Sequence, residues 1–407
     1  MGESDLMPTS AADLLSAAYN DADRTIDLRR RLHRQPEIGL HLPRTQEMVL
    51  EAFTGLPVEI TTGKSVSSVV AVLRGARPGP TYLLRGDMDA LPVHEDTGLP
   101  FASEVPGAMH ACGHDTHVAM LLGAARLLAE RRDELAGQIV FMVQPGEEGF
   151  HGARYMLEEG LLDIVPEAPV SGAFALHISA TLASGSVNVR PGPMMAAADQ
   201  WRMTVLGRGG HASQPHAAAD PIPVAAEIVL ALQTLVTRRV DVFDPAVVTV
   251  AHIRAGSTNN VIPDSAFLEG TIRTLSAERR ADLVASVRRV ATHIGAAHGI
   301  PVEFEHEEGY PVTVNDVHAA ATVLETAAEL LGDRASCLLP SPLMGAEDFS
   351  YVLQRVPGAM AFLGACPPGM EPETAPGNHS NLVVFDEEPL PAGVALYAQM
   401  AMQALAG

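Results

Sequence analysis

The sequence predicts an α/β protein whose first domain is built on a mostly parallel sheet and carries an inserted, ferredoxin-like α+β domain. Three observations predict this fold. Strand-like and helical segments alternate through the first half of the chain, the strands are almost continuously apolar, and a strand–helix–strand–strand–helix–strand order follows. Apolar strands that alternate with helices indicate a parallel sheet covered on both faces, and the second order is typical of a ferredoxin-like sandwich.

The first part of the chain supplies the alternating segments. Helical periodicity appears at 11–35 and at 44–53. The segments that follow are expected as strands at 67–75, 79–93, 137–149 and 172–178, and as helices at 117–135 and 152–162. We therefore assign residues 1–193 to the first segment of the domain built on the parallel sheet.

The pattern changes after residue 193. The next segments are expected as strands at 200–210, 246–256 and 265–275, with long helices at 220–240 and 277–299. We expect residues 194–308 to form the inserted domain, and residues 309–407 to return to the first domain and complete its sheet.

Composition excludes several classes of protein. The 407 residues are 47% hydrophobic, which is enough for two or three buried domains. The net charge is -22 and no dense basic run occurs, so no nucleic-acid partner is expected. The N-terminus lacks the features of a signal peptide, and no run of about 18 apolar residues indicates a membrane span. Three cysteines are too few for a disulfide framework, so we expect a cytoplasmic protein with reduced thiols.

Polar side chains follow several of the expected strands at the point where each strand ends. Asp87 and Asp89 follow "TYLLRG", Glu147 and Glu148 follow "QIVFMVQPG", and His177 closes "GAFALH". Because open α/β sheets bind their ligands at the carboxyl edge, we expect these side chains to converge there.

The stretch "HACGHDTH" places Cys112 and His114 close to the start of an apolar helix. A lone pair of this kind could equally be a buried structural cysteine beside a solvated histidine. Here the helix dipole favours a thiolate, and carboxylates and histidines converge from other strands, so a metal site is favoured. His110 and His117 lack such support and are expected beside the ligands or at the surface.

The adjacent carboxylates of Glu147 and Glu148 suit metal-dependent hydrolysis. On a turn the two side chains point in different directions, so one can bind a cation while the other acts as general base on a water. His177 could also be an ordinary core histidine. His379 lies on a Gly/Pro-rich loop, and its position in the sequence does not by itself indicate a metal ligand.

The inserted domain offers His211 in "GRGGHASQPH", and Asn259 and Asn260 in "AGSTNNVIPD". A Gly-Gly before a histidine indicates a tight turn that presents the imidazole. Spacing alone assigns these loops no reaction, and no phosphate-binding loop, dinucleotide fingerprint or nucleophile elbow is found in the sequence.

Eight motifs occur in an order that resembles a known family: "LHRQPEIGL", "LLRGDMDALPV", "HACGHD", "QPGEEG", "GRGGHAS", "NVIPD", "MGAEDFSY" and "NHSNLV". Together they resemble the amidohydrolase branch of the aminoacylase/carboxypeptidase metallopeptidase family. That branch includes hippurate hydrolases, N-acyl-amino-acid deacylases and auxin–amino-acid conjugate hydrolases. The likeness covers nearly the whole chain.

The resemblance implies a site for two divalent ions held by Cys112, His114, Glu148, His177 and His379. Cys112 would bridge both ions, with Glu148 and His379 completing one set of ligands and His114 and His177 the other. A thiolate suits Mn, Zn, Co or Ni rather than Mg or Ca.

The resemblance also implies roles for residues that do not bind metal. Asp89 would orient a ligand, and Glu147 would activate the attacking water. The inserted domain would serve as lid and dimerisation domain of a homodimer, in which His211 reaches the partner subunit's site to stabilise the oxyanion, with Asn260 nearby to bind substrate.

The function implied is hydrolysis of the amide bond of an N-acyl amino acid by a water that the metals activate. Three alternatives stay open. A dipeptidase or carboxypeptidase would use the same residues. A cysteine-nucleophile enzyme would need Cys112 free of metal. A non-catalytic metal-binding ligand sensor would not need the carboxylate of Glu147 beside its ligand.

Overall fold

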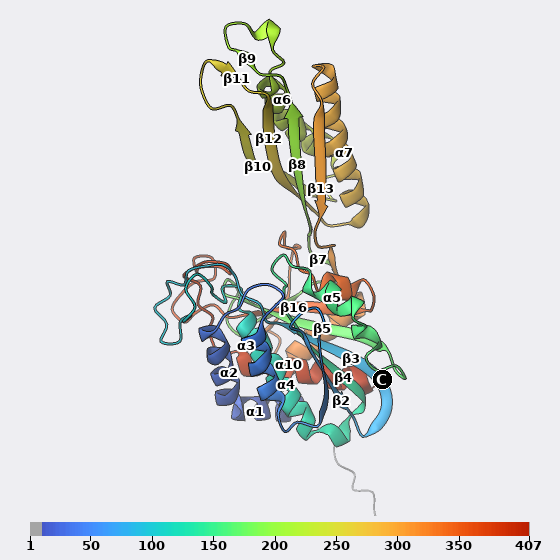
Figure 1. Cartoon of the computed structure of the whole chain (residues 1–407). Helices are drawn as coiled ribbons and strands as arrows, with labels where there is room; N and C mark the ends of the chain where they lie inside the picture. The colour runs from blue at the N-terminus through green and yellow to red at the C-terminus, as the bar shows by residue number, and fades with distance from the viewer. Residues whose placement is uncertain (1–9, 407) are drawn as a thin grey trace, which may run out of the picture. The chain divides into compact units, whose positions relative to one another are not determined.

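A computed structural model of the protein describes residues 10–406. The chain forms two compact units (Figure 1). The first unit comprises the chain up to Met194, residues Val314–Ser341 and the chain from Tyr351 onward, and the second comprises Met195–Thr313 and Pro342–Ser350. Each unit has its own sheet and its own hydrophobic core.

An eight-stranded sheet forms the centre of the first unit. Its strands are β1 (Val58–Thr62), β2 (Val69–Arg74), β3 (Arg77–Asp87), β4 (Ala136–Gln144), β5 (Val170–Ser179), β6 (Val187–Val189), β15 (Ser336–Leu338) and β16 (Gly358–Gly364). They lie in the order β1-β2-β4-β3-β5-β16-β6-β15. The pairings β3–β4, β3–β5, β5–β16 and β6–β15 are parallel, and the other three are antiparallel. The expected α/β class with a mostly parallel sheet is confirmed.

Helices share a core with this sheet. They are α1 (Ala11–Asn20), α2 (Ala22–Arg34), α3 (Pro43–Phe53), α4 (His114–Glu130), α8 (Val317–Leu331) and α10 (Leu390–Ala406). α4 and α10 contact each other and β3. α4 is buried continuously from His114 to Leu128. A helix buried on all sides is apolar around its whole circumference, which explains the long apolar run in this part of the sequence.

The expectation of a single helix at 11–35 is wrong, because α1 and α2 are separated at Asp21. The backbone of Asp21 leaves the helical region, with φ of -101° and ψ of 13°. Its carboxylate accepts a hydrogen bond of 2.7 Å from Nε of Arg126 in α4. The break therefore coincides with a contact to a distant helix, and the periodicity of 11–35 carries no sign of that contact.

The second unit is a four-stranded antiparallel sheet with two helices. Its elements are β8 (Ala197–Leu206), α6 (Pro221–Arg239), β10 (Ala246–Ala255), β12 (Ser265–Thr274), α7 (Ala277–Ala297) and β13 (Val302–Glu308). The strand order is β10-β12-β8-β13. Burial alternates along β8 and β12, and their buried residues share a core with α6 and α7. The expected ferredoxin-like sandwich is confirmed (Figure 1).

α6 is long and apolar enough, by length and composition, to cross a membrane, although no such run was expected from the sequence. Its side chains Val224, Ile228 and Leu232 are buried in the core of the second unit. Core helices pass the same test of length and composition. Packing against the sheet therefore accounts for the apolar residues on one face of α6.

Candidate metal centre

The candidate ligands gather where three neighbouring strands of the first sheet end. β4, β3 and β5 are adjacent and parallel, so their carboxyl ends lie at one edge of the sheet. Asp87 is the last residue of β3, Glu147 and Glu148 follow β4 after a Pro-Gly turn, and His177 lies close to the end of β5. The expected convergence of these side chains is confirmed.

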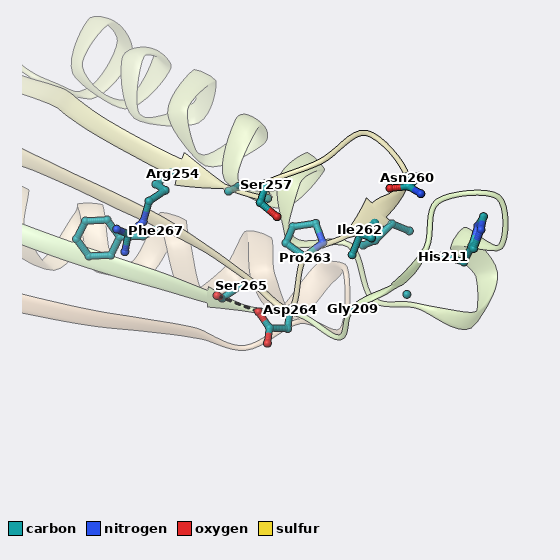
Figure 2. Close-up of a pocket in the computed structure, with 14 residues that line it drawn as sticks. Gly209, His211, Arg254, Ser257, Asn260, Ile262, Pro263, Asp264, Ser265 and Phe267 are labelled. Carbon is teal, nitrogen blue, oxygen red and sulfur yellow. Dashed lines mark hydrogen bonds between the residues drawn. The ribbon is translucent and has the colours of Figure 1, made fainter.

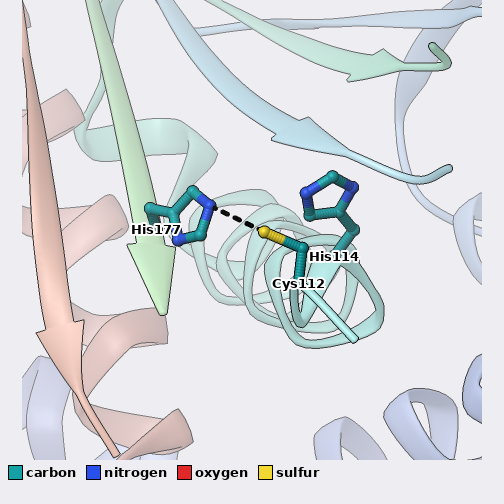
Figure 3. A group of neighbouring side chains, drawn as sticks. All are labelled: Cys112, His114 and His177. Carbon is teal, nitrogen blue, oxygen red and sulfur yellow. Dashed lines mark hydrogen bonds between the residues drawn. The ribbon is translucent and has the colours of Figure 1, made fainter. Parts of the chain in front are cut away.

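Five side chains bring their ligand atoms together here, in two groups that share Cys112. One group is Cys112, His114 and His177 (Figure 3), and the other is Cys112, Glu148 and His379; within each group the atoms lie within 4.8 Å of one another. Sγ of Cys112 is 3.5 Å from Nε2 of His177 and 3.3 Å from Nε2 of His379. The structure thus makes neighbours of all five residues predicted as ligands.

The start of α4 sets the positions of Cys112 and His114. Gly113, between them, caps the helix with φ of 84°, and an added Cβ there would collide with Ile178. Only glycine fits such a turn without strain. Nδ1 of His114 lies 2.8 Å from the carbonyl oxygen of Asp89, so Nδ1 donates and Nε2 carries the lone pair of the neutral ring. Nε2 is buried, 3.3 Å from Oδ2 of Asp87, and becomes a ligand atom when a metal ion takes the place of its proton.

Asp89 fixes the turn that carries Glu147 and Glu148. Its buried carboxylate accepts the backbone N–H of Glu147 at 2.9 Å and that of Glu148 at 3.0 Å. Its backbone carbonyl holds His114. One aspartate therefore connects the turn after β4 to the first residue of α4, and its carboxylate oxygens are both engaged in doing so.

His110 and His117 are both buried, which rules out the surface, and His117 lies beside the candidate ligands His114 and His177, the other place expected for it. α4 and the loop before it are covered on all sides, which helical periodicity alone does not reveal. Nδ1 of His117 lies 2.6 Å from Oδ1 of Asp87, and its Nε2 accepts the N–H of Ile178 at 2.8 Å. His117 therefore ties the end of β3 to the end of β5.

The pKa values of the candidate histidine ligands shift in opposite directions. Hydrogen bonds to Cys112 and Glu148 raise the pKa of His379 to about 10. Burial lowers the pKa of His114, but the negative charge of Asp87 and nearby acceptors outweigh it and raise that pKa well above its usual value. Burial, together with the charge of His117, lowers the pKa of His177 well below its usual value. The set of thiolate, imidazole and carboxylate donors fits Zn, Mn, Co or Ni.

A buried polar network joins α2 to the first turn of α4, and the sequence analysis missed it. Oδ2 of Asp115, the residue after His114, lies 2.8 Å from Nε of Arg29 and 2.9 Å from Nδ1 of His33. Arg29 and His33 are buried next to Leu28 and Leu32 on one face of α2. The sequence did carry a sign of this network, because Arg29 and His33 lie at positions of α2 that the apolar helical pattern assigns to the buried face.

We expect Arg29→Met to lower the free energy of unfolding by about 3–5 kcal/mol. The substitution breaks a buried ion pair and leaves the carboxylate of Asp115 buried without the positive charge of Arg29. A urea titration followed by circular dichroism measures the change. Arg24→Met on the same helix is the matched control, since Arg24 is 72% exposed and pairs only loosely with Asp21; it should cost about 0–1 kcal/mol. Equal losses in the two variants would contradict the prediction.

The second unit has a pocket of its own, of about 720 Å³, which contains His211 and Asn260 (Figure 2). His211 ends the short strand β9 (Gly210–His211), which pairs with β11 (Val261–Ile262) next to Asn260. Nδ1 of His211 accepts the backbone N–H of Ser213 at 3.1 Å, so the hydrogen of the neutral ring lies on Nε2. The two residues singled out in the insert are therefore neighbours, and the neutral ring of the histidine offers its Nε2 hydrogen as a donor.

Known proteins resemble the chain over most of its length. Thermostable carboxypeptidase 1 of Saccharolobus solfataricus is 38% identical over 399 residues, which are 96% of this chain and 99% of the relative. IAA-amino acid hydrolase ILR1-like 4 of Arabidopsis thaliana is 38% identical over 397 residues, which are 96% of this chain and 88% of the relative. The crystal structure of a dinuclear metal binding peptidase of the M20 family from Bacillus subtilis matches with a TM-score of 0.81 and 33% identity, over 95% of this chain and 99% of that chain.

The family assignment follows from these likenesses. Residues 83–403 match the peptidase family M20/M25/M40. That match covers more than half of the chain, and the relatives cover almost all of it, so the resemblance seen in the sequence motifs is confirmed. The chain belongs to the peptidase family M20/M25/M40 and is a hydrolase.

Proposed function

We propose that the protein hydrolyses the amide bond of N-acyl amino acids with the help of two divalent ions, and releases a carboxylic acid and a free amino acid. The observation that carries the proposal is the cluster of five candidate ligands around Cys112, with Glu147 next to Glu148 on a single braced turn. The name of one relative, an IAA-amino acid hydrolase, supports a conjugated amino acid as substrate.

The proposed ligands are the two groups that share Cys112. Cys112 would belong to both sets of ligands, with Glu148 and His379 completing one set and His114 and His177 completing the other. Mn, Zn, Co or Ni ions held there would supply Lewis-acid chemistry, which polarises a carbonyl and lowers the pKa of water. The membership of Cys112 in both groups of neighbouring ligand atoms supports its place in both sets.

Glu147 moves the proton in the proposed reaction. Its carboxylate accepts a proton from the attacking water and passes it to the leaving nitrogen. The side chain is 6% exposed, and its backbone N–H is held by Asp89. Because a general base must stay within hydrogen-bond reach of its water, Asp89 contributes to the reaction by fixing this turn.

His211 stabilises the oxyanion that forms at the amide carbon, and Asn260 binds substrate beside it. The support is the tautomer of His211: a backbone N–H occupies its Nδ1, so the neutral ring offers its Nε2 hydrogen as a donor. Developing negative charge on oxygen is stabilised by donors of this kind when they are held in place in advance.

The second unit acts as lid and dimerisation domain of a homodimer. β10 lies at one edge of its sheet. Apolar side chains are exposed on and around it, among them Ile253 (53% exposed), Phe243 (94%) and, on α6, Leu230 (70%). A strand edge beside exposed apolar side chains favours association with a second copy of the chain.

We place the protein in the cytoplasm. Its three cysteines, Cys112, Cys337 and Cys366, are free, as is usual for proteins of a reducing compartment.

A carboxypeptidase or dipeptidase activity is the second candidate function. It would use the same ligands and the same general base, and would differ in the acyl group accepted. The 38% identity to thermostable carboxypeptidase 1 favours it.

Hydrolysis should disappear on exhaustive chelation and return on addition of Mn, Zn, Co or Ni, because Lewis-acid chemistry is essential to the proposed reaction. The reconstituted protein is assayed on acetyl, benzoyl, long-chain acyl and indole-acetyl amino acids beside dipeptides. Faster turnover of the acylated amino acids supports the first candidate, and faster turnover of dipeptides supports the second.

Three other outcomes would contradict both metal-dependent candidates, the amidohydrolase and the carboxypeptidase or dipeptidase. Full activity in protein shown by elemental analysis to be metal-free would contradict the metal centre. Activity that survives chelation and is lost on thiol alkylation would favour Cys112 as a nucleophile. Metal uptake without turnover of any substrate would favour a ligand sensor.

A further inference from the structure

The side chain of Asn378 lies between segments that carry candidate ligands. Its Nδ2 donates to the carbonyl oxygen of Cys112 at 3.1 Å and to that of Ile178 at 3.0 Å. Its Oδ1 accepts the N–H of Ala180 at 3.2 Å. A single amide therefore uses both hydrogens and its oxygen to join the loop before α4 to the end of β5, where His177 lies.

The partners of Asn378 determine how its amide is oriented. Two carbonyl oxygens can only accept hydrogen bonds, and a backbone N–H can only donate one, so Nδ2 and Oδ1 cannot be exchanged. Nδ2 also lies 3.9 Å from Sγ of Cys112. The amide thus turns its donor end towards the sulfur.

The residue after Asn378 is held in an uncommon backbone conformation. His379 has φ of 72°, in the left-handed region that side chains other than glycine rarely adopt. Its N–H donates to the carbonyl oxygen of Ala111 at 2.8 Å. In this conformation Nε2 of His379 lies 3.1 Å from Oε1 of Glu148 and 3.3 Å from Sγ of Cys112. A strained backbone persists only where its surroundings hold it, and the bonds of Asn378 are part of those surroundings.

We propose that Asn378 is a positioning residue of the metal centre, which holds Cys112, His177 and His379 in their places as candidate ligands. This inference rests on the proposed metal-dependent function. Asn378 contacts the backbone of the ligand-bearing segments, so it acts through the ligands. Groups that hold metal ligands from behind are commonly needed for full affinity.

Cobalt(II) is a suitable probe, because a thiolate bound to cobalt gives a charge-transfer absorption in the near ultraviolet that does not depend on turnover. Asn378→Ala removes all three hydrogen bonds. Asn378→Asp keeps the size of the side chain and the oxygen that accepts from Ala180. It replaces the donor Nδ2 with an oxygen, which repels the carbonyl oxygens of Cys112 and Ile178. We expect both variants to bind cobalt about 10–100-fold more weakly than wild type and to show a shifted or weakened charge-transfer band.

The control is Asn381→Ala. Asn381 is an exposed amide on the same loop, and its side chain makes no hydrogen bond with any residue that the structure describes. The Asn381→Ala variant should bind cobalt with wild-type affinity and show an unchanged charge-transfer band. Thermal unfolding of the metal-free variants shows whether each one folds.

The outcomes separate this inference from the proposed function. Folded Asn378→Ala and Asn378→Asp with wild-type cobalt affinity and an unchanged band would overturn the inference alone. Equal losses in the control would also overturn it, because they would show that any change in the loop has this effect. Failure of both variants to fold would assign Asn378 to the fold instead. A wild-type protein that binds no cobalt and lacks the band would overturn the metal centre, and the inference with it.

Discussion

Glu147→Gln should bind its metal ions as the wild type does and lose turnover by about 10²–10⁴-fold, the usual contribution of a general base. The amide of glutamine has nearly the size of the carboxylate but cannot accept the proton of the attacking water. The backbone N–H that Asp89 holds is unchanged by the substitution, so the turn should keep its shape. Elemental analysis measures bound metal, and initial rates at saturating substrate measure kcat.

Glu148→Gln should behave in the opposite way and lose metal first. Its Oε1 lies 3.1 Å from Nε2 of His379 and belongs to the group that includes Cys112, so the substitution replaces a charged candidate ligand with a neutral one. Glu130→Gln, at an exposed position of α4, is the matched control and should change neither quantity. If Glu147→Gln loses metal and Glu148→Gln keeps it, the two roles are assigned the wrong way round.

His211→Ala should lower kcat by about 10²–10³-fold, the usual loss when one oxyanion donor is removed. Nε2 of His211 carries the free hydrogen of the ring because Ser213 occupies Nδ1, and alanine offers no donor in its place. Metal content should stay at the wild-type level, because His211 lies in the second unit and belongs to neither group of candidate ligands. Elemental analysis and kcat again provide the measurement.

Mixing His211→Ala with Glu147→Gln should restore activity if His211 completes the site of the partner subunit. In the mixed dimer one site then combines an intact Glu147 from one chain with an intact His211 from the other. If subunits exchange at random and the sites are independent, activity should reach about a quarter of wild type in the proposed symmetric dimer.

The control mixture pairs Glu147→Gln with Glu148→Gln. Both residues lie on one turn of one chain, so no combination of these subunits rebuilds an intact site and no activity should return. If subunits exchange, as shown by mass labelling, and the His211→Ala mixture stays inactive, His211 acts within its own chain or has no part in the reaction.

The sequence by itself determined the fold class and the edge of the sheet at which the candidate ligands meet. Apolar strands that alternate with helices indicate a parallel sheet, and neighbouring parallel strands end at the same edge. Asp89, Glu148 and His177 therefore had to converge once their strands were recognised. This part was accessible because periodicity and strand ends are local properties of the chain.

Only the tertiary structure decided which distant side chains brace that edge. Asn378 forms a hydrogen bond with Cys112, which is 266 residues away in the sequence, and His33 forms one with Asp115, which is 82 residues away. The break between α1 and α2 likewise coincides with a bond from Arg126, 105 residues away from Asp21. Local periodicity specifies which residues of a segment face inwards, but not which remote segment they meet. That choice is made when helices, strands and loops pack together and each buried polar group must find its partner.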